Sequence, residues 1–292
     1  MSDKPHWMIY GANGYTGRLI ALEAVRQGLS PILAGRSQPQ VQLLASELGL
    51  EYRIFDLKDS SATQSALQDV RVVAHCAGPF VATSTQMIDA CLTSGSHYLD
   101  ITGEVPVFIA AQARNADALA AGVVLCPGAG FDVIPTDCLA ASLKLALPDA
   151  THLALGFDMF ASMSPGTAKT TVEGLGNGGL IRENSTLRTT AIAADSRDID
   201  FGRGVKHAAS IPWGDVATAY FSTDIPNIVV YMAMPKTQAL VMRWLLNPLR
   251  SLFKSSKVQD WLKAQVDRRI KGPDAQQRPQ YRAWLWGEVC NA

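Results

Sequence analysis

Short apolar runs alternate with longer amphipathic stretches along the first half of the chain. The runs have the length of buried strands, and the stretches between them have the apolar spacing of helices. The predicted strands are His6–Tyr10, Ser30–Ala34, Glu51–Phe55, Arg71–Cys76, His97–Ile101 and Val123–Cys126. The predicted helices are Arg18–Gln27, Gln40–Leu48, Thr85–Ser94, Val107–Ala121 and Thr136–Leu147. Regular alternation of strand and helix predicts a parallel sheet with helices on both faces.

The second half of the chain loses this alternation. Its strand-like runs are Thr151–Phe160, Lys206–Ile211, Ala217–Tyr220 and Asn227–Ala233. Ser164 followed by Pro165 is a typical helix start, and the NGG segment that ends at Gly179 is expected to be a flexible loop. The fold class is therefore α/β with two domains. We expect a Rossmann-type doubly wound parallel sheet in residues 1–148, and a second α+β domain for substrate binding or dimerisation in residues 149–292.

Composition and charge narrow the class of protein. The chain has 292 residues, of which 48% are hydrophobic, and its formal net charge is zero. A neutral chain does not favour a nucleic-acid-binding surface. The start, MSDKPHW, lacks the pattern of a secretory signal, and no apolar run approaches the roughly 20 residues of a membrane span. We expect a cytoplasmic protein that takes a small-molecule substrate and binds no nucleic acid.

The cysteines are five in number and widely spaced, at positions 76, 91, 126, 138 and 290. This spacing favours neither a disulfide framework nor a zinc site, so no metal is predicted. The thiols are expected to be reduced and mostly buried as small apolar side chains.

A glycine-rich loop follows the first predicted strand and opens a helix. Gly11 allows a sharp turn, Gly14 allows close approach to a pyrophosphate, and Gly17 allows the helix to pack closely. The helix N-terminus offers free N–H groups to phosphate. The residues predicted to contact a dinucleotide here are Gly11, Asn13, Gly14, Tyr15, Thr16 and Gly17. The alternative is a turn whose glycines serve packing alone.

The end of the second predicted strand indicates which dinucleotide is preferred. NAD sites usually place an acidic residue there, whereas this chain has Gly35, Arg36 and Ser37. Arg36 suits a 2′-phosphate, and Ser37 adds a hydrogen bond, so NADP is predicted over NAD. The alternative for Arg36 is a surface role. Asp56, after the third strand, either accepts from the adenine amino group or caps the next helix.

Two further loops of the predicted sheet carry polar residues. In HCAGPF, the residues Cys76, Gly78 and Pro79 are placed near the nicotinamide ribose. Cys76 is interpreted as a packing residue rather than a nucleophile, because no base adjoins it. In HYLDITGE, strand alternation puts Tyr98, Asp100 and Thr102 on one face.

The candidate catalytic residues come from this second loop. They are Tyr98, Asp100 and Glu104. The alternative is that these polar groups only satisfy loop backbone. Asp132 in PGAGFDVIPTD is a weaker candidate, and turn stabilisation is the preferred interpretation for it.

Residues Lys236–Lys271 carry nine Lys or Arg against two Asp, an excess of seven positive charges. Large apolar residues, including Trp244 and Trp261, are interleaved with these charges. Such a segment suits peripheral contact with an anionic membrane. We favour the other interpretation, in which the apolar side packs on its own domain or on a dimer partner.

Five blocks together resemble the saccharopine dehydrogenase-like oxidoreductases, a group that includes trans-acting enoyl reductases. They are GANGYTGRL, LAGRS, HCAGPF, ACLTSGSHYLDITGE and PGAGFDVIPTD, in this order. The resemblance implies an NAD(P)-binding Rossmann domain and a second α/β domain, but not saccharopine as substrate. Asn13 departs from the usual small hydroxylated residue of the family.

The C-terminus departs from the family more strongly. The chain stops at WLWGEVCNA, where members continue with another strand and a helix that pack back on the Rossmann domain. We therefore expect a shortened chain, whose C-terminal strand returns to the first domain and which forms a homo-oligomer.

Taken together, these features predict an NADP(H)-dependent oxidoreductase that transfers hydride to or from an unidentified substrate of enoyl or acyl type. The alternative is a non-catalytic NADP-binding scaffold or a lipid-surface-associated protein. An amino-acid dehydrogenase would need a basic pocket for carboxylates, which Arg182, Arg188 and Arg203 would supply unless they are surface charges.

Overall fold

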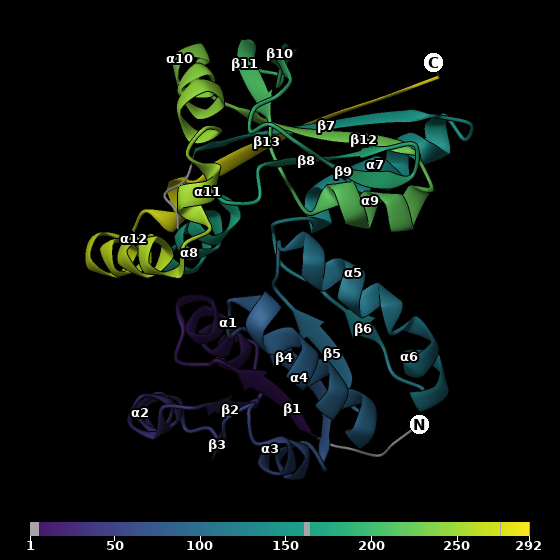
Figure 1. The fold of residues 1–292 in the computed structure, drawn as a ribbon. Coiled ribbons are helices and arrows are strands. Elements are labelled where there is room, and N and C mark those ends of the chain that lie inside the picture. Colours follow the sequence, from purple (N-terminus) through teal and green to yellow (C-terminus); the bar gives the residue numbers. More distant parts are fainter. Residues whose placement is uncertain (1–5, 161–163, 275, 292) are drawn as a thin grey trace. The chain divides into compact units, whose positions relative to one another are not determined.

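The computed structural model describes residues 6–160, 164–274 and 276–291 (Figure 1). Contacts between elements divide the chain into two compact units, Met1–Asp132 and Val133–Ala292. The sequence predicts the boundary after residue 148, so the two divisions differ by one helix. Each unit has its own sheet.

The first unit contains a sheet of six parallel strands. The strands are β1 (His6–Tyr10), β2 (Ile32–Gly35), β3 (Tyr52–Ile54), β4 (Val70–His75), β5 (His97–Asp100) and β6 (Leu125–Cys126). The helices are α1 (Tyr15–Arg26), α2 (Gln38–Leu48), α3 (Ser60–Ala66), α4 (Phe80–Ser94), α5 (Val105–Ala113) and α6 (Asn115–Ala121). The strand order is β3-β2-β1-β4-β5-β6, the doubly wound order of dinucleotide-binding domains. The predicted Rossmann-type sheet is confirmed.

The core of this unit lies on both faces of the sheet. Met8 and Tyr10 point into one apolar cluster, while Ile9 between them points into another. Alternate residues of a strand face opposite sides, and here both sides are covered by helices. This explains why β1 is a continuous apolar run rather than an alternating one.

One predicted helix of this unit is two helices. The Ala-rich stretch Val107–Ala121 is interrupted at Arg114, which separates α5 from α6. The guanidinium of Arg114 forms ion pairs with Asp89 on α4 and Asp117 on α6. These contacts hold the junction, and the helix composition alone did not indicate it.

The second unit is a mixed sheet with helices. Its strands are β7 (His152–Phe160), β8 (Gly179–Glu183), β9 (Thr186–Thr190), β10 (Ser196–Asp200), β11 (Val205–Ser210), β12 (Asn227–Ala233) and β13 (Arg282–Cys290). Its helices are α7 (Ile134–Ala146), α8 (Pro165–Gly174), α9 (Asp215–Thr223), α10 (Lys236–Val241), η1 (Met242–Leu246), α11 (Arg250–Phe253), α12 (Ser256–Arg269) and η2 (Arg278–Gln280). The main strand order is β10-β11-β12-β7-β13. This sheet confirms the predicted second α+β domain.

Two predictions in the second unit are wrong. Ala217–Tyr220, predicted as a strand, lies in helix α9, whose buried Val216, Ala217 and Ala219 face the unit's interior. A short apolar run cannot be assigned to strand or helix from its pattern alone. Gly179, expected in a loop, begins β8 of a hairpin that the sequence did not indicate.

The C-terminal strand β13 pairs with β7 over nine residues in antiparallel register, from Arg282 opposite Phe160 to Cys290 opposite His152. The strand therefore belongs to the second unit and does not join the first sheet as expected. Helix α7 packs on β13 and α9, which is why the second unit begins at Val133. Within the described residues β13 is an edge strand; assembly into a homo-oligomer stays a prediction.

The basic segment Lys236–Lys271 forms α10, η1, α11 and α12. Helix α12 packs on α8 through Leu262 and Val266, as favoured from the sequence. The tryptophans do not pack on their own unit, since Trp244 is 72% exposed and Trp261 is 62% exposed; packing on a dimer partner stays a prediction. Among the described residues, no helix is long and apolar enough to cross a membrane.

The cysteines differ from expectation in one respect. All five are free thiols. Only Cys91 is buried, whereas Cys126, Cys138 and Cys290 are exposed and Cys76 is intermediate. The prediction of mostly buried thiols is therefore wrong.

Candidate cofactor site

The loops at the carboxyl ends of β1, β2, β4 and β5 form the candidate site. Parallel strands bring these ends to one edge of the sheet, where doubly wound folds bind their ligands. Gly11 follows β1, and its N–H donates to Ala34 O of β2 at 2.8 Å. Cys76, after β4, donates from its N–H to Tyr10 O at 2.8 Å. The ends of β1, β2 and β4 are thus tied together by backbone hydrogen bonds.

Two glycines of the first loop are required by close backbone contacts. Gly11 has a φ of +82°, and a Cβ there would lie 2.8 Å from Ala77 N. A Cβ on Gly17 would lie 2.3 Å from Gly11 O. Neither position accommodates a side chain, so the loop turns sharply and α1 packs tightly against it. Packing thus accounts for Gly11 and Gly17.

Gly14 is different from the other two glycines. It is the N-cap residue of α1 with extended dihedrals, and no side chain caps the helix end among the described residues. The first turn of α1 also contains no acidic residue. Tyr15 and Thr16 begin the helix and are partly exposed. An uncapped N-terminus without a local carboxylate presents its N–H groups and positive dipole end to an anion.

The end of β2 carries a basic residue beside this loop. Arg36 is exposed and forms no ion pair with any residue that the structure describes. Burial and the charge of Asp56 raise the pKa of Tyr10 to about 12, while the charge of Arg36 acts in the opposite direction. Both charges therefore act close to the end of β1. Ser37 caps α2 by position, but its hydroxyl makes no capping hydrogen bond.

Asn13 contacts the first turn of α2. Its Nδ2 donates to Gln40 Oε1 at 2.7 Å. A Cβ on Gly35 would lie 3.1 Å from Asn13 Oδ1, so Gly35 makes room for the Asn13 side chain. Asn13 thus links the glycine loop to α2.

Asp56 does not cap the next helix. The N-cap of α3 is Asp59, whose carboxylate accepts from Ala62 N–H. Asp56 Oδ1 instead accepts from Lys58 N–H at 3.0 Å and stabilises the turn after β3. The capping alternative for Asp56 is therefore wrong, and its contact with adenine stays a prediction.

His75 and Cys76 at the end of β4 are set by burial. His75 is fully buried, and burial lowers its pKa to about 3, so the ring is neutral. Thr83 donates its hydroxyl proton to Ala77 O at 2.8 Å, so its oxygen accepts from His75 Nε2 at 3.0 Å. Burial raises the pKa of the Cys76 thiol to about 12. This raised pKa supports a packing role for Cys76.

The loop from Cys76 leads directly into α4. Gly78 and Pro79 are joined by a cis peptide bond. Phe80 N–H donates to Glu104 Oε1 at 3.0 Å, and Val81 N–H donates to Glu104 Oε2 at 2.8 Å. Glu104, from the loop after β5, thus supplies a carboxylate to the N-terminus of α4. The sequence did not indicate this cap, because Phe80 and Glu104 are 24 positions apart.

The polar residues of β5 and of the loop that follows it form one buried chain of hydrogen bonds. Tyr98 Oη donates to Asp100 Oδ2 at 2.5 Å. Asp100 Oδ1 accepts from Thr102 N–H at 2.9 Å and from Gly128 N–H at 2.7 Å. Thr102 Oγ1 then accepts from Glu104 N–H at 3.0 Å. The hydrogen bonds among Tyr98, Asp100 and Thr102 agree with the shared face that strand alternation predicts.

Burial sets the charge of this network. Tyr98, Asp100 and Glu104 are at most 8% exposed. Burial, with the Asp100 charge, raises the pKa of Tyr98 far above its ordinary value. Burial also raises the pKa of Asp100, and its three hydrogen bonds oppose that rise. Asp132, whose pKa burial raises, lies so near Gly103 that a Cβ there would sit 2.9 Å from Asp132 Oδ2. These groups face one another and the backbone rather than solvent.

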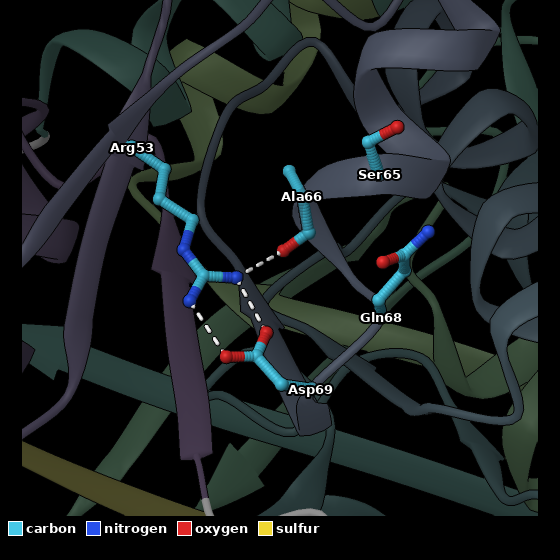
Figure 2. A pocket seen from close by; sticks show the side chains of 5 residues that line it. All are labelled: Arg53, Ser65, Ala66, Gln68 and Asp69. Carbon is cyan, nitrogen blue, oxygen red and sulfur yellow. Dashed lines mark hydrogen bonds and ion pairs between the residues drawn. The ribbon is translucent and has the colours of Figure 1, made fainter.

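A separate hollow of about 580 Å³ lies at the other edge of the first sheet (Figure 2). Arg53 on β3 donates to both carboxylate oxygens of Asp69, at 2.6 and 2.9 Å, and to Ala66 O at 2.6 Å. Asp69 precedes β4, so the hollow adjoins the amino end of that strand. The Arg53 guanidinium lowers the pKa of Asp69 to about 2. The charges here neutralise each other, and the hollow is not the candidate cofactor site.

The three arginines considered as a carboxylate pocket have separate partners. Arg182 is buried, donates to Val216 O and Ser185 O, and lies over the ring of Tyr220. Arg188 pairs with Glu183, and Arg203 lies over Trp284 at 3.9 Å. Each guanidinium is thus engaged by a partner within the chain. In the parts of the chain described, no group of three or more His, Cys, Asp or Glu residues is placed to hold a metal.

Residues 7–126, nearly the whole of the first sheet, match the family model described as the saccharopine dehydrogenase NADP binding domain. This region is thus similar to the NADP-binding domain of the saccharopine dehydrogenases, and the match covers less than half of the chain. The match confirms the family resemblance of the five sequence blocks and the prediction of an NADP-binding Rossmann domain. It does not extend to the second unit.

Two named proteins match about the same share of the chain as the family model does. The saccharopine dehydrogenase-like oxidoreductase of Homo sapiens is 29% identical over 155 residues, 45% of this chain and 35% of that protein. A trans-acting enoyl reductase of Mycobacterium leprae is 29% identical over 139 residues, 44% of this chain and 33% of that protein. The matched region thus spans about a third of the length of these relatives.

The second unit is related to known proteins through its fold. The apo saccharopine dehydrogenase (L-Glu forming) of Saccharomyces cerevisiae aligns with 94% of this chain and 70% of its own, at a TM-score of 0.62 and 12% identity. This likeness confirms the predicted fold class of a Rossmann-type domain with a second α+β domain. At this identity it says nothing of substrate.

Proposed function

We propose that this chain is an NADP(H)-dependent oxidoreductase whose cofactor lies along the carboxyl edge of the first sheet. One observation carries the proposal: an NADP-binding family domain presents an uncapped α1 N-terminus beside an exposed arginine without an ion-pair partner among the described residues. When bound, NADPH supplies a hydride. The protein binds and orients the cofactor and the substrate, and it excludes water from them.

The glycine loop would hold the pyrophosphate. A Cβ placed on Gly14 would have only Gly11 O within 4 Å among the described residues, at 3.2 Å, so the outer side of Gly14 is open to a ligand. The N–H groups at the start of α1 would donate to phosphate oxygens. Asn13, Tyr15 and Thr16 line this entry, and Gly11 and Gly17 keep the turn tight.

Arg36 would select NADPH over NADH. Its planar guanidinium matches a phosphate bidentately, and the residues beside it, Gly35 and Ser37, add neither bulk nor negative charge. The Ser37 hydroxyl, which does not cap α2, would donate to the same phosphate. Asp56, at the end of β3, would accept from the adenine amino group.

Cys76, Gly78 and Pro79 would lie along the nicotinamide ribose. The buried network behind them supports a positioning role for Tyr98, Asp100 and Glu104, because their oxygens already bond one another and the backbone. If one of these groups exchanges a proton with substrate, the loop after β5 must first open. The substrate class we propose is an α,β-unsaturated acyl compound, on the naming of the enoyl reductase relatives.

The test is hydride transfer from NADPH deuterated at the nicotinamide C4. Unsaturated acyl and imine compounds are offered in turn, and the product is analysed by mass spectrometry. One deuterium in the product of an enoyl substrate supports the proposal. Tight NADPH binding without transfer to any compound of either class would favour the alternative, a non-catalytic NADP-binding scaffold.

A further inference from the structure

The helices after β12 carry large apolar side chains on their outer surface. We define the apolar stripe as Leu240, Val241, Trp244, Leu245, Leu249 and Leu252, all of them exposed. Most are spaced three to four positions apart, which places them along one side of α10, η1 and the turn into α11. Figure 1 shows these helices as a green group beside the second sheet, apart from α7 and α9. Such a contiguous exposed patch indicates an interaction surface.

The opposite side of the same helices already faces the protein. Ala239 is buried, and Met242, Leu246 and Phe253 are partly buried. Asn247 fixes the segment by accepting from Ile192 N–H at 2.8 Å and donating to Ile192 O at 3.2 Å. The segment is therefore docked by one apolar side while the apolar stripe points outward. An ordinary surface helix would be polar on that outward side.

The same segment carries exposed basic residues. Arg243, Lys254 and Lys257 are exposed, and no carboxylate of the described residues forms an ion pair with them. Two other lysines are engaged: Lys236 lies 3.7 Å from Asp198, and Lys263 lies 2.6 Å from Glu173. Three exposed basic residues on or next to the helices of the stripe thus have no ion-pair partner among the described residues.

Helix α12 shows the same division into an inner and an outer side. Leu262 and Val266 pack against Ala168 and Val172 of α8. Trp261 lies on the outer side and is 62% exposed. Two exposed tryptophans in one basic segment are typical of proteins that contact the lipid headgroup region, where the indole ring has both apolar and polar partners.

We propose that the apolar stripe and its flanking basic residues dock this protein on the surface of an anionic lipid bilayer. The positive charge of the segment favours an anionic bilayer over a second copy of the chain as the partner of this surface. Two copies meeting through this surface would bring like charges together, whereas anionic headgroups would neutralise them. Among the described residues no helix is suited to span a bilayer, so the contact is one in which the helices lie in the interface plane.

The test is co-sedimentation of the whole chain with phosphatidylcholine vesicles, prepared with or without phosphatidylserine. Binding is expected only with phosphatidylserine and should be lost in high salt, because the Debye length falls to about 3 Å at 1 M. Arg243→Gln with Lys254→Gln should weaken binding about 25-fold, the conversion of about 1 kcal/mol for each basic residue. Trp244→Ala with Leu245→Ala should weaken it at least tenfold.

Matched controls use exposed residues elsewhere. Leu119→Ala with Leu145→Ala removes apolar surface outside the segment, and Lys58→Gln with Arg71→Gln removes the same charge; both pairs should bind vesicles like the wild type. Thermal unfolding of every variant should match the wild type, since all these side chains are exposed. Equal binding to neutral vesicles, or binding that survives both segment variants, would overturn the proposal. So would light scattering that shows a dimer dissociated by the Trp244 and Leu245 changes.

Discussion

Two helices begin at the same edge of the first sheet, after the adjacent strands β1 and β4, and their N-termini differ. The start of α4 receives the carboxylate of Glu104 on two N–H groups. The start of α1 receives no side-chain cap from the described residues and has no acidic residue in its first turn. Both ends have the same dipole and the same unsatisfied N–H groups before capping.

We infer from this difference that the protein fills the anion site at α4 with its own carboxylate and leaves the one at α1 for a ligand. Glu104 neutralises α4 within a buried network, so α4 is stabilised but is unavailable to phosphate. At α1 the glycines take the place of a capping side chain, and the helix start stays accessible to a ligand oxygen. Substitutions at the N-terminus of α1 or of α4 test this difference.

The largest effect is expected at Gly17. Gly17→Ala puts a Cβ 2.3 Å from Gly11 O, and because that oxygen belongs to the backbone the loop must move. We expect a loss of about 3 kcal/mol in the free energy of unfolding and no measurable NADPH binding. Urea denaturation and calorimetry measure the two effects. Gly174→Ala, at the end of α8 with nothing among the described residues within 4 Å, is the matched control and should change stability by less than about 1 kcal/mol.

The second largest effect on stability is expected from removing the cap of α4. Glu104→Ala removes a buried carboxylate from two N–H groups and should cost about 2–3 kcal/mol of unfolding free energy. Ser164→Ala removes a partly exposed cap from α8 and should cost about 1 kcal/mol. Both are measured by urea denaturation at neutral pH. Equal costs for the two changes would contradict the view that Glu104 is part of a buried network.

His75 gives a prediction in the dependence of stability on pH. Its folded pKa is about 3, lowered by burial from 6.5, so between these values the unfolded chain binds one more proton than the folded chain. Stability therefore falls as pH falls through this window, by about 1.4 kcal/mol per pH unit from this residue. The difference in slope between wild type and His75→Gln, measured between about pH 4 and 5.5, should show this amount. Parallel slopes would contradict a buried neutral ring.

The smallest effect concerns two aspartates after β3. Asp59→Ala removes the cap of α3 and should cost about 1 kcal/mol. Asp56→Ala removes only a turn contact and should cost about 0.5 kcal/mol or less. Thermal unfolding of the two variants side by side checks the order. The opposite order would return the capping role to Asp56.

The fold of the first unit was predictable from the sequence because its elements are local and repeated. Strands such as β1 are buried on both faces, so they read as short apolar runs whatever their neighbours. The exception was the break at Arg114, which depends on ion pairs with residues from two helices.

The second unit was harder to predict because its sheet is assembled from distant parts. β7 is a strand by pattern, but its partner β13 lies more than a hundred positions later. The run at Ala217 has an apolar pattern that suits either a strand or a helix, and only packing decides. In the basic segment, the pattern showed apolar residues but not which side of the helix would face inward.

In the candidate site too, the residues in contiguous motifs were predictable from the sequence, whereas the roles that depend on tertiary contacts were not. The glycine loop and Arg36 lie in short contiguous motifs and were found there. The role of Glu104 depends on a contact between two loops, and a list of acidic residues near a strand end cannot distinguish a catalytic acid from a cap. Tyr98 and Asp100 are likewise buried because β6 and the loop after it cover them. This is a tertiary contact, and the local sequence around β5 does not indicate it.

We infer that the open N-terminus of α1, with Arg36 beside it, binds NADPH, while the N-terminus of α4 is closed by Glu104. The most direct test is calorimetric titration of NADPH and NADH into the wild type and Arg36→Ala. We expect NADPH to bind the wild type more tightly than NADH. Arg36→Ala should weaken NADPH binding by about 1.5–3 kcal/mol, the contribution of hydrogen bonds to a charged group, and leave NADH nearly unchanged. Equal affinities of the wild type for the two cofactors, or equal weakening of both by the substitution, would contradict the account.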